Sequence, residues 1–121
     1  MEIAGLVPKL LALPAAALLA ACSEGGESAL SPLAQQGKLV YQNVCIACHN
    51  GDPTKDGALG PAVAGASEEL LYARVIEGTY PPGYEPKRPG QGVMPQFEYL
   101  EEQIPALAAY LAEVDVSSPG S

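Results

Sequence analysis

Apolar residues recur with helical spacing in two separate stretches of the 121-residue chain. The first stretch ends at position 44 and aligns Leu33, Gly37, Val40, Tyr41 and Val44. The second lies near the C-terminus and aligns Ile104, Leu107, Ala108, Leu111 and Val114. This spacing predicts two amphipathic helices. Because an apolar stripe needs a partner, we expect the two helices to pack against each other.

A third, shorter helix is predicted between these two. Ser67 is a suitable N-cap for the segment EELLYARVIE at residues 68–77, and Gly78 is a suitable stop. Pro105 fits the C-terminal helix only within its first turn, so we expect that helix to begin near residues 101–103. No stretch alternates apolar and polar residues for long enough to predict a sheet. The pattern therefore predicts an all-α fold.

The N-terminal segment has the pattern of an export signal. Residues 10–21 form an apolar run that follows Lys9 and contains Pro14. A helix of that length rises about 18 Å, well short of the roughly 30 Å hydrocarbon core of a bilayer. The run is therefore interpreted as the apolar region of a signal peptide rather than as a membrane span.

The apolar run ends in Leu-Ala-Ala-Cys at residues 19–22, which resembles the lipobox of bacterial lipoproteins. The resemblance implies that Cys22 is lipidated and becomes the first residue after cleavage. Ordinary signal cleavage and an uncleaved anchoring signal are the alternatives. The expected organisation is a signal peptide at 1–21, a lipidated cysteine with a flexible tether at 22–33, a compact domain at 34–116 and a disordered tail at 117–121.

The charge balance narrows the classes of partner. The chain has 14 acidic and 6 basic residues, which gives a formal net charge of −8. This excess argues against nucleic acid and against an electrostatic hold on anionic lipid. A compact part of about 80 residues buries a modest core and usually needs an additional staple. The 13 glycines and 12 prolines indicate a loop-rich fold.

Two cysteines and the single histidine form the motif C-x-x-C-H at Cys45, Cys48 and His49. This is the attachment signature of c-type haem, in which the sulfurs form thioethers to the porphyrin and the imidazole takes the proximal iron position. On a tight helical segment, this spacing places both sulfurs along one edge of the macrocycle. Covalent haem c, with its iron, would also supply the staple that so small a domain needs.

Three other kinds of cysteine site contain parts of the C-x-x-C-H motif. A zinc site would need a fourth ligand, and the chain has no second histidine. A thioredoxin-like redox pair would need a βαβ context. A simple disulfide would leave His49 without a role. The export signal upstream agrees with haem attachment.

With these motifs the chain resembles the class I cytochromes c, from about Leu33 to Val116. The family's ordered landmarks are matched by Gly37, Tyr41, Cys45, Gly60-Pro61, Met94-Pro95 and the Leu-x-x-Tyr of Leu107 and Tyr110. The resemblance implies about three main helices with long loops wrapped around one covalently bound haem. It also implies that Gly37 allows two helix backbones to approach closely, with Tyr110 packed nearby.

The resemblance further implies a sulfur ligand on the second face of the iron. Met94 is the one methionine besides Met1, which would leave with the signal. A core role for Met94, with Lys55, Lys87 or water on the iron, is the alternative. The family also assigns the acceptor for the His49 ring N–H to the carbonyl of Pro61. We expect some residues of the following polar loop to contact the haem propionates, and the candidates are Tyr80, Tyr84, Arg88 and Gln91. Arg74 is interpreted as part of a solvent-exposed helix face.

Imidazole and thioether ligands together leave the iron without a vacancy, which indicates electron transfer rather than catalysis. The sequence therefore predicts a lipid-anchored, mono-haem electron carrier that is not an enzyme and that faces the periplasm or cell exterior. Its expected partners are membrane redox proteins: a donor dehydrogenase or bc-type complex, and an acceptor oxidase or reductase. They would approach the exposed haem edge around Ile46, Ala47, Val93 and Gln96. Docking there is expected to rest on an apolar patch or on a basic partner.

Two alternatives keep the haem and change the role. In the first, the protein is a fixed subunit of one oxidase or dehydrogenase complex. In the second, it binds gas or peroxide at an open sixth position.

Overall fold

The structure, a computed structural model, describes residues 29–90 and 93–117. The expected signal peptide, the lipidated Cys22, most of the tether and Gln91 lie outside the described residues. Within them the chain forms helices and loops without any strand, which confirms the predicted all-α fold. No helix in the described part of the chain is both long and apolar enough to cross a membrane. The elements in order are α1 (Pro32–Val44), η1 (Cys45–Ala47), α2 (Glu68–Leu71), η2 (Tyr72–Glu77), η3 (Glu98–Gln103) and α3 (Ile104–Ser117).

Helix α1 begins at Pro32 because the residue before it is an N-cap. The Ser31 hydroxyl accepts a hydrogen bond from the backbone N–H of Ala34 at 3.1 Å, and proline suits the first helical position. The buried side of α1 carries Ala34, Gly37 and Tyr41. Leu33, placed on the apolar stripe by the sequence pattern, is 47% exposed, so that assignment was wrong by one position.

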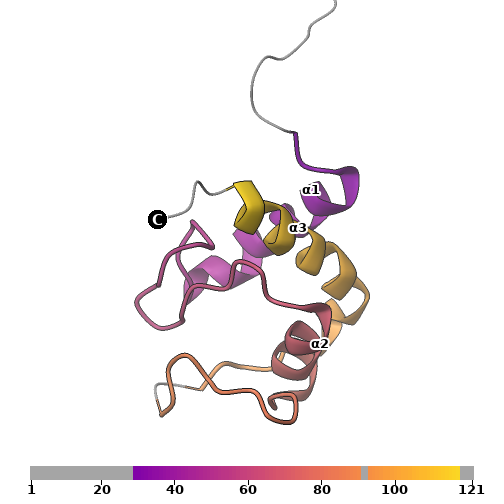
Figure 1. The fold of residues 1–121 in the computed structure, drawn as a ribbon. Helices are drawn as coiled ribbons and strands as arrows, with labels where there is room; N and C mark the ends of the chain where they lie inside the picture. The colour runs from indigo at the N-terminus through magenta and orange to yellow at the C-terminus, as the bar shows by residue number, and fades with distance from the viewer. Residues whose placement is uncertain (1–28, 91–92, 118–121) are drawn as a thin grey trace, which may run out of the picture.

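Helices α1 and α3 cross at close range, and Figure 1 shows them side by side. A Cβ atom added to Gly37 would lie 1.9 Å from the carbonyl oxygen of Ala106, so only glycine fits at the crossing. Tyr41 and Tyr110 pack next to it with ring centroids 5.7 Å apart. The structure thus confirms the mutual packing of the two helices and the close approach at Gly37.

The predicted third helix is present, but it changes from an α-helix to a π-helix along its length. The Ser67 hydroxyl caps α2 by accepting from the N–H of Leu70 at 3.1 Å. The following segment, η2, is a π-helix, and it ends at Gly78 with φ of 71°. A π-helix is a rare element that occurs mostly as a single turn within an α-helix, frequently at a functional site.

Three of the expected boundaries need correction. A 3-10 turn, η3, precedes α3, so the α-helix starts at Ile104 with Pro105 as its second residue, just after the expected start. Helix α3 includes Ser117, whose hydroxyl donates to the Val114 carbonyl at 3.0 Å, so the tail does not begin there. At the other end, the cap at Ser31 places Pro32 and Leu33 in α1 rather than in the tether.

The core lies between α1, α3 and the α2–η2 segment. Its most buried large side chains are Tyr41, Leu107 and Leu111. Long loops cover the side away from α2 and connect the helices around the lower edge in Figure 1. These loops carry most of the residues that the sequence singled out for chemistry.

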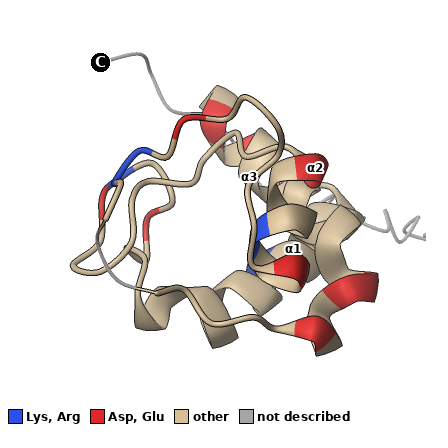
Figure 2. Ribbon diagram, turned by 90° about the horizontal axis from the view of Figure 1, so that it is seen from below, with Lys and Arg blue, Asp and Glu red and all other residues tan. Residues whose placement is uncertain are grey.

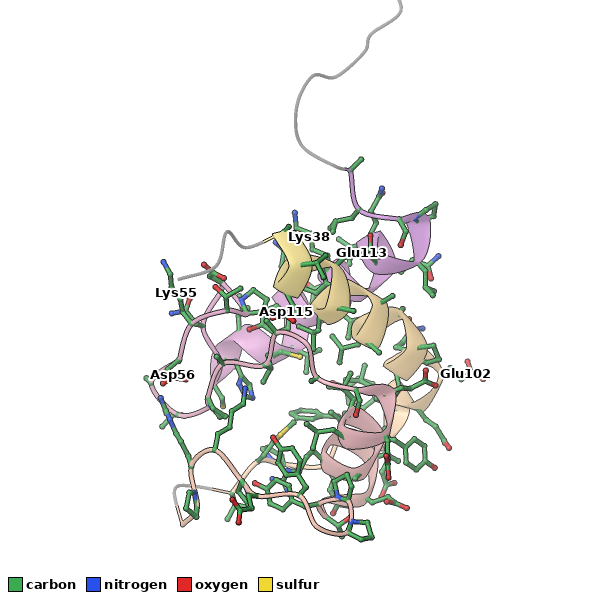
Figure 3. The ribbon with its side chains drawn as sticks, viewed as in Figure 1. Lys38, Lys55, Asp56, Glu102, Glu113 and Asp115 are labelled. Carbon is green, nitrogen blue, oxygen red and sulfur yellow. The ribbon has the colours of Figure 1, made fainter. Side chains whose placement is uncertain are left out.

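A carboxylate on α3 ties down the start of α1. Glu113 accepts hydrogen bonds from the backbone N–H of Ser31 at 2.8 Å and from its hydroxyl at 2.6 Å. Figure 3 shows Glu113 at the end of the molecule where α1 starts. These hydrogen bonds hold the pKa of Glu113 below its ordinary value of 4.5.

The Glu113 clamp predicts a pH-dependent contribution to stability. A lowered pKa in the folded state stabilises the protein above the ordinary pKa and is lost as pH falls through the folded-state value. We therefore expect Glu113→Gln to lower the thermal midpoint at pH 7, and the gap from wild type to close as the pH is taken below 4.5. Thermal denaturation followed by circular dichroism measures this. Glu85→Gln is the charge-matched control, and a gap that stayed constant with pH would contradict the assignment.

Candidate functional site

The C-x-x-C-H motif lies on a tight turn at the end of α1. Cys45 opens η1, and its carbonyl accepts from the N–H of Cys48 at 3.2 Å and of His49 at 2.9 Å. The turn follows α1 directly, so the packing of α1 against α3 also determines where the motif lies. The Tyr41 hydroxyl adds a further hold by donating to the carbonyl of Asn50.

Both cysteines of the motif are partly buried. Burial raises the pKa of the Cys45 thiol to about 11. A reactive redox cysteine usually has a lowered pKa, so this environment does not favour the thioredoxin-like interpretation. Cys45 and Cys48 form no disulfide with each other, so the structure gives no support to the disulfide interpretation.

His49 is oriented by the loop that follows the motif. Its Nδ1 lies 2.8 Å from the carbonyl oxygen of Pro61, the contact that the resemblance implied. A carbonyl can only accept, so Nδ1 carries the proton and Nε2 has a free lone pair. Among the described residues, no side chain forms a hydrogen bond with Nε2. An imidazole fixed in this tautomer is prepared to bind a metal through Nε2.

Two glycines allow the 57–61 segment to lie directly against the motif. A Cβ atom at Gly60 would lie 2.5 Å from Cε1 of His49, and one at Gly57 would lie 2.7 Å from the Cys48 carbonyl oxygen. The backbone N–H of Gly60 in turn donates to that carbonyl at 2.9 Å. Gly60-Pro61 is therefore more than a turn. The absence of a side chain at Gly60 lets the segment lie against the His49 ring, and the Pro61 carbonyl then accepts a hydrogen bond from that ring.

Met94 is partly buried and packs against the same hydrophobic core as Cys45. The segment after it is fastened to the end of η2. The N–H of Phe97 donates to the Val75 carbonyl at 2.7 Å, and the Gln96 amide donates to the Ile76 carbonyl at 3.0 Å. The last carbonyls of a helix lack partners within it, and these two are satisfied by the Met94 segment.

Gln96 therefore has a role that the sequence did not reveal. We expected it among exposed residues that meet a partner, and it is exposed, but its amide is committed to the end of η2. No pattern in the sequence indicates this contact, because residues 72–77 have the composition of an ordinary helix.

The loop at residues 79–90 is organised by aromatic and cationic contacts. Tyr80 and Tyr84 stack with centroids 5.5 Å apart, and the Arg74 guanidinium lies 4.1 Å from the centre of the Tyr80 ring. The interpretation of Arg74 as a solvated helix face was wrong, since it makes this cation–π contact and is partly buried. Arg88, one of the residues expected to contact a propionate, instead donates a hydrogen bond to the backbone carbonyl of Gly57 at 2.9 Å.

The two lysines that were considered as alternatives to Met94 on the iron have other partners. Lys87 donates to the Ala62 carbonyl at 2.8 Å, and the Lys55 ammonium lies 3.7 Å from the carboxylate of Asp52. The described residues also contain no group of three or more His, Cys, Asp or Glu placed to hold a metal ion. Within the described part of the chain, the zinc interpretation therefore finds no ligand set.

A comparison with protein families finds one match, to the family described as Cytochrome c, over residues 34–115. The matched range contains the C-x-x-C-H motif, Pro61 and Met94. No curated protein and no solved structure gives a significant match.

Proposed function

The chain belongs to the cytochrome c family, and from this premise we propose that it is a lipid-anchored carrier of single electrons between membrane redox complexes. The family binds haem c covalently, and the residues that the structure describes form helices and no strand, as expected for the class I fold. The observation that supports the proposal most strongly is the orientation of His49, whose Nδ1 is engaged by Pro61 at 2.8 Å while Nε2 is left for the iron.

The residues present fit a covalently attached haem. Cys45 and Cys48 lie on one turn and form no disulfide, so both sulfurs could form thioether bonds. His49 offers a neutral, oriented nitrogen, and Met94 is the one thioether besides Met1. The group supplies a one-electron change at iron. The protein residues hold it, set its ligands and exclude water.

We assign the two axial positions to His49 and Met94. Nitrogen and thioether sulfur satisfy iron in both oxidation states and favour a high reduction potential. With both positions taken, a substrate has no place on the iron, so the proposed role is a carrier and not an enzyme. Pro61 keeps the imidazole in one tautomer and one orientation during each electron transfer.

The membrane part of the proposal rests on the sequence. A lipidated Cys22 would attach the domain through the short segment that precedes Ser31, where α1 is capped. If the eight residues from 23 to 30 behave as a flexible chain, their r.m.s. span is about 16 Å, so the domain would stay close to the bilayer. We therefore propose a location on a membrane, facing the periplasm or the cell exterior.

Mass spectrometry of the exported protein tests the cofactor and the anchor together. We expect one haem adduct on the peptide that contains Cys45 and Cys48, and a lipid adduct on Cys22. Cys22→Ala is the matched variant, and it should keep the haem and lose the lipid. Free thiols at Cys45 and Cys48 in exported material would overturn the cofactor assignment. An unmodified Cys22 would overturn the anchor alone.

The surface expected to meet partners is uncharged. Val93 is 94% exposed and Ile46 is 45% exposed, and both lie next to residues assigned to the haem. Figure 2 shows acidic residues on the helices and loops and few basic ones, in agreement with 14 acids and 6 bases in the chain. We therefore propose that partners dock through apolar contact near these two side chains.

Apolar docking predicts a weak dependence on salt. Raising the ionic strength from low to physiological should change the rate of electron transfer to isolated membranes of the source organism by less than about threefold, because screening acts on charges. Ferricyanide is the control reagent. It is an anion repelled by a chain of net charge −8, so its rate should rise with salt. A steep fall of the membrane rate would instead indicate a basic partner surface.

A further inference from the structure

Two cationic side chains tie together the loops that carry the two proposed iron ligands. Arg88 donates to the carbonyl of Gly57 at 2.9 Å, and Lys87 donates to the carbonyl of Ala62 at 2.8 Å. Both cations lie on the loop that leads to Met94. Both acceptors lie on the segment that follows the C-x-x-C-H motif. The contacts therefore join parts of the chain that are 31 and 25 residues apart.

The acceptor segment is the one that orients His49. The two bonds hold it at Gly57 and Ala62, on either side of Gly60 and Pro61, which contact the imidazole. Fixing both ends of so short a segment limits the movement of the Pro61 carbonyl between them.

Asp56 reinforces this junction. One of its carboxylate oxygens accepts from the N–H of Ala62 at 2.8 Å, and the other lies 3.6 Å from the Arg88 guanidinium. The Ala62 N–H, with Arg88 nearby, holds the pKa of Asp56 below its ordinary value. Figure 3 shows Asp56 on the loop at the edge of the molecule opposite Glu102. The Arg88 side chain is only 23% exposed, so its hydrogen bond is partly shielded from water.

The far end of the Met94 loop is also fixed. Gln96 and Phe97 bond to the Ile76 and Val75 carbonyls at the end of η2. Met94 therefore lies between an anchor at residues 87–88 and an anchor at residues 96–97. Loss of the first anchor would leave the loop held on one side only.

We propose that Lys87 and Arg88 form a latch that binds the backbone of the His49 segment and so helps to keep Met94 in its proposed position as a ligand. They act as positioning residues, since they reach the iron only through the chain segments that they hold. The inference rests on the proposed His49 and Met94 ligation. It adds that closure of the sixth position depends on these two cations rather than on Met94 alone.

Binding of added imidazole to the ferric haem protein measures the latch. Imidazole is neutral at a pH well above its pKa, and under that condition the removal of cations from the protein does not by itself attract or repel the probe. It binds when Met94 leaves the iron, and the rate therefore follows the population of the open loop. In Lys87→Gln/Arg88→Gln we expect this rate to rise about tenfold or more, because hydrogen bonds from charged donors are lost. Arg88→Lys in the presence of Lys87 should restore most of the slow rate.

Lys55→Gln is the matched control. Lys55 is also a loop cation with a carboxylate partner, but it is 71% exposed and bonds to Asp52 within its own turn. This variant should bind imidazole at the wild-type rate. A double variant that binds imidazole no faster than wild type would overturn the latch. Failure of the ligation itself would be recognised differently, since wild type would then bind imidazole as fast as Met94→Ala.

Discussion

Replacing Met94 with alanine is expected to convert a ferrous haem protein that does not bind carbon monoxide into one that binds it rapidly. The chain has no second histidine, and Met94 is the one methionine besides Met1, so no thioether remains to replace it. Lys87 and Lys55 are engaged with Ala62 and Asp52. The sixth position of the iron should then hold only water or an added ligand, and the reduction potential should fall because the thioether is lost.

The measurements are the visible spectrum of the ferrous protein with and without carbon monoxide, and a redox titration. Met94→His is the matched variant, since it restores a sixth ligand of a harder type. It should exclude carbon monoxide and still have a lower potential than wild type. Leu59→Ala, a change at an exposed apolar residue, should leave both measurements unchanged. Rapid carbon monoxide binding by the wild type would contradict the Met94 assignment and favour an open gas-binding site.

The short-range features of this protein could be predicted from the sequence because the physics that produces them is local. The cap at Ser67, the stop at Gly78 and the position of Pro105 depend on neighbouring residues only, and all three lie where expected. The C-x-x-C-H turn is also local. Its hydrogen bonds to the Cys45 carbonyl come from residues only three and four positions further along the chain.

The features that the sequence did not predict depend on residues distant in the chain. Leu33 has the right spacing for the apolar stripe, but the crossing with α3 buries Ala34 instead. The roles of Gln96 and Arg88 depend on carbonyls of η2 and of the His49 segment, and a carbonyl acceptor has no residue type that a motif could show. Arg74 looked solvated because its aromatic partner, Tyr80, lies beyond the end of its helix.

The crossing of α1 and α3 is a long-range feature that one residue type did indicate. Glycine inside a helix costs stability relative to alanine unless another backbone needs the space. At Gly37 that need is explicit, since a Cβ atom would lie 1.9 Å from the Ala106 carbonyl oxygen and 2.9 Å from the Leu107 nitrogen. These are backbone atoms, so no side-chain rotation relieves the clash, and the two helices would have to separate.

We therefore expect Gly37→Ala to destabilise the haem protein by about 3 kcal/mol or more, the range of a severe overpacking, even though alanine is the better helix former. Separation would also pull apart Tyr41 and Tyr110 and shift the end of α1, where Cys45 begins the haem motif. Chemical denaturation followed by circular dichroism gives the free energy of unfolding. Gly51→Ala is the control, because a Cβ atom there would meet nothing within 4 Å, and its effect should stay within about 0.5 kcal/mol. Equal effects of the two substitutions would mean that α1 and α3 do not cross at Gly37, and the position of the haem motif would then need another explanation.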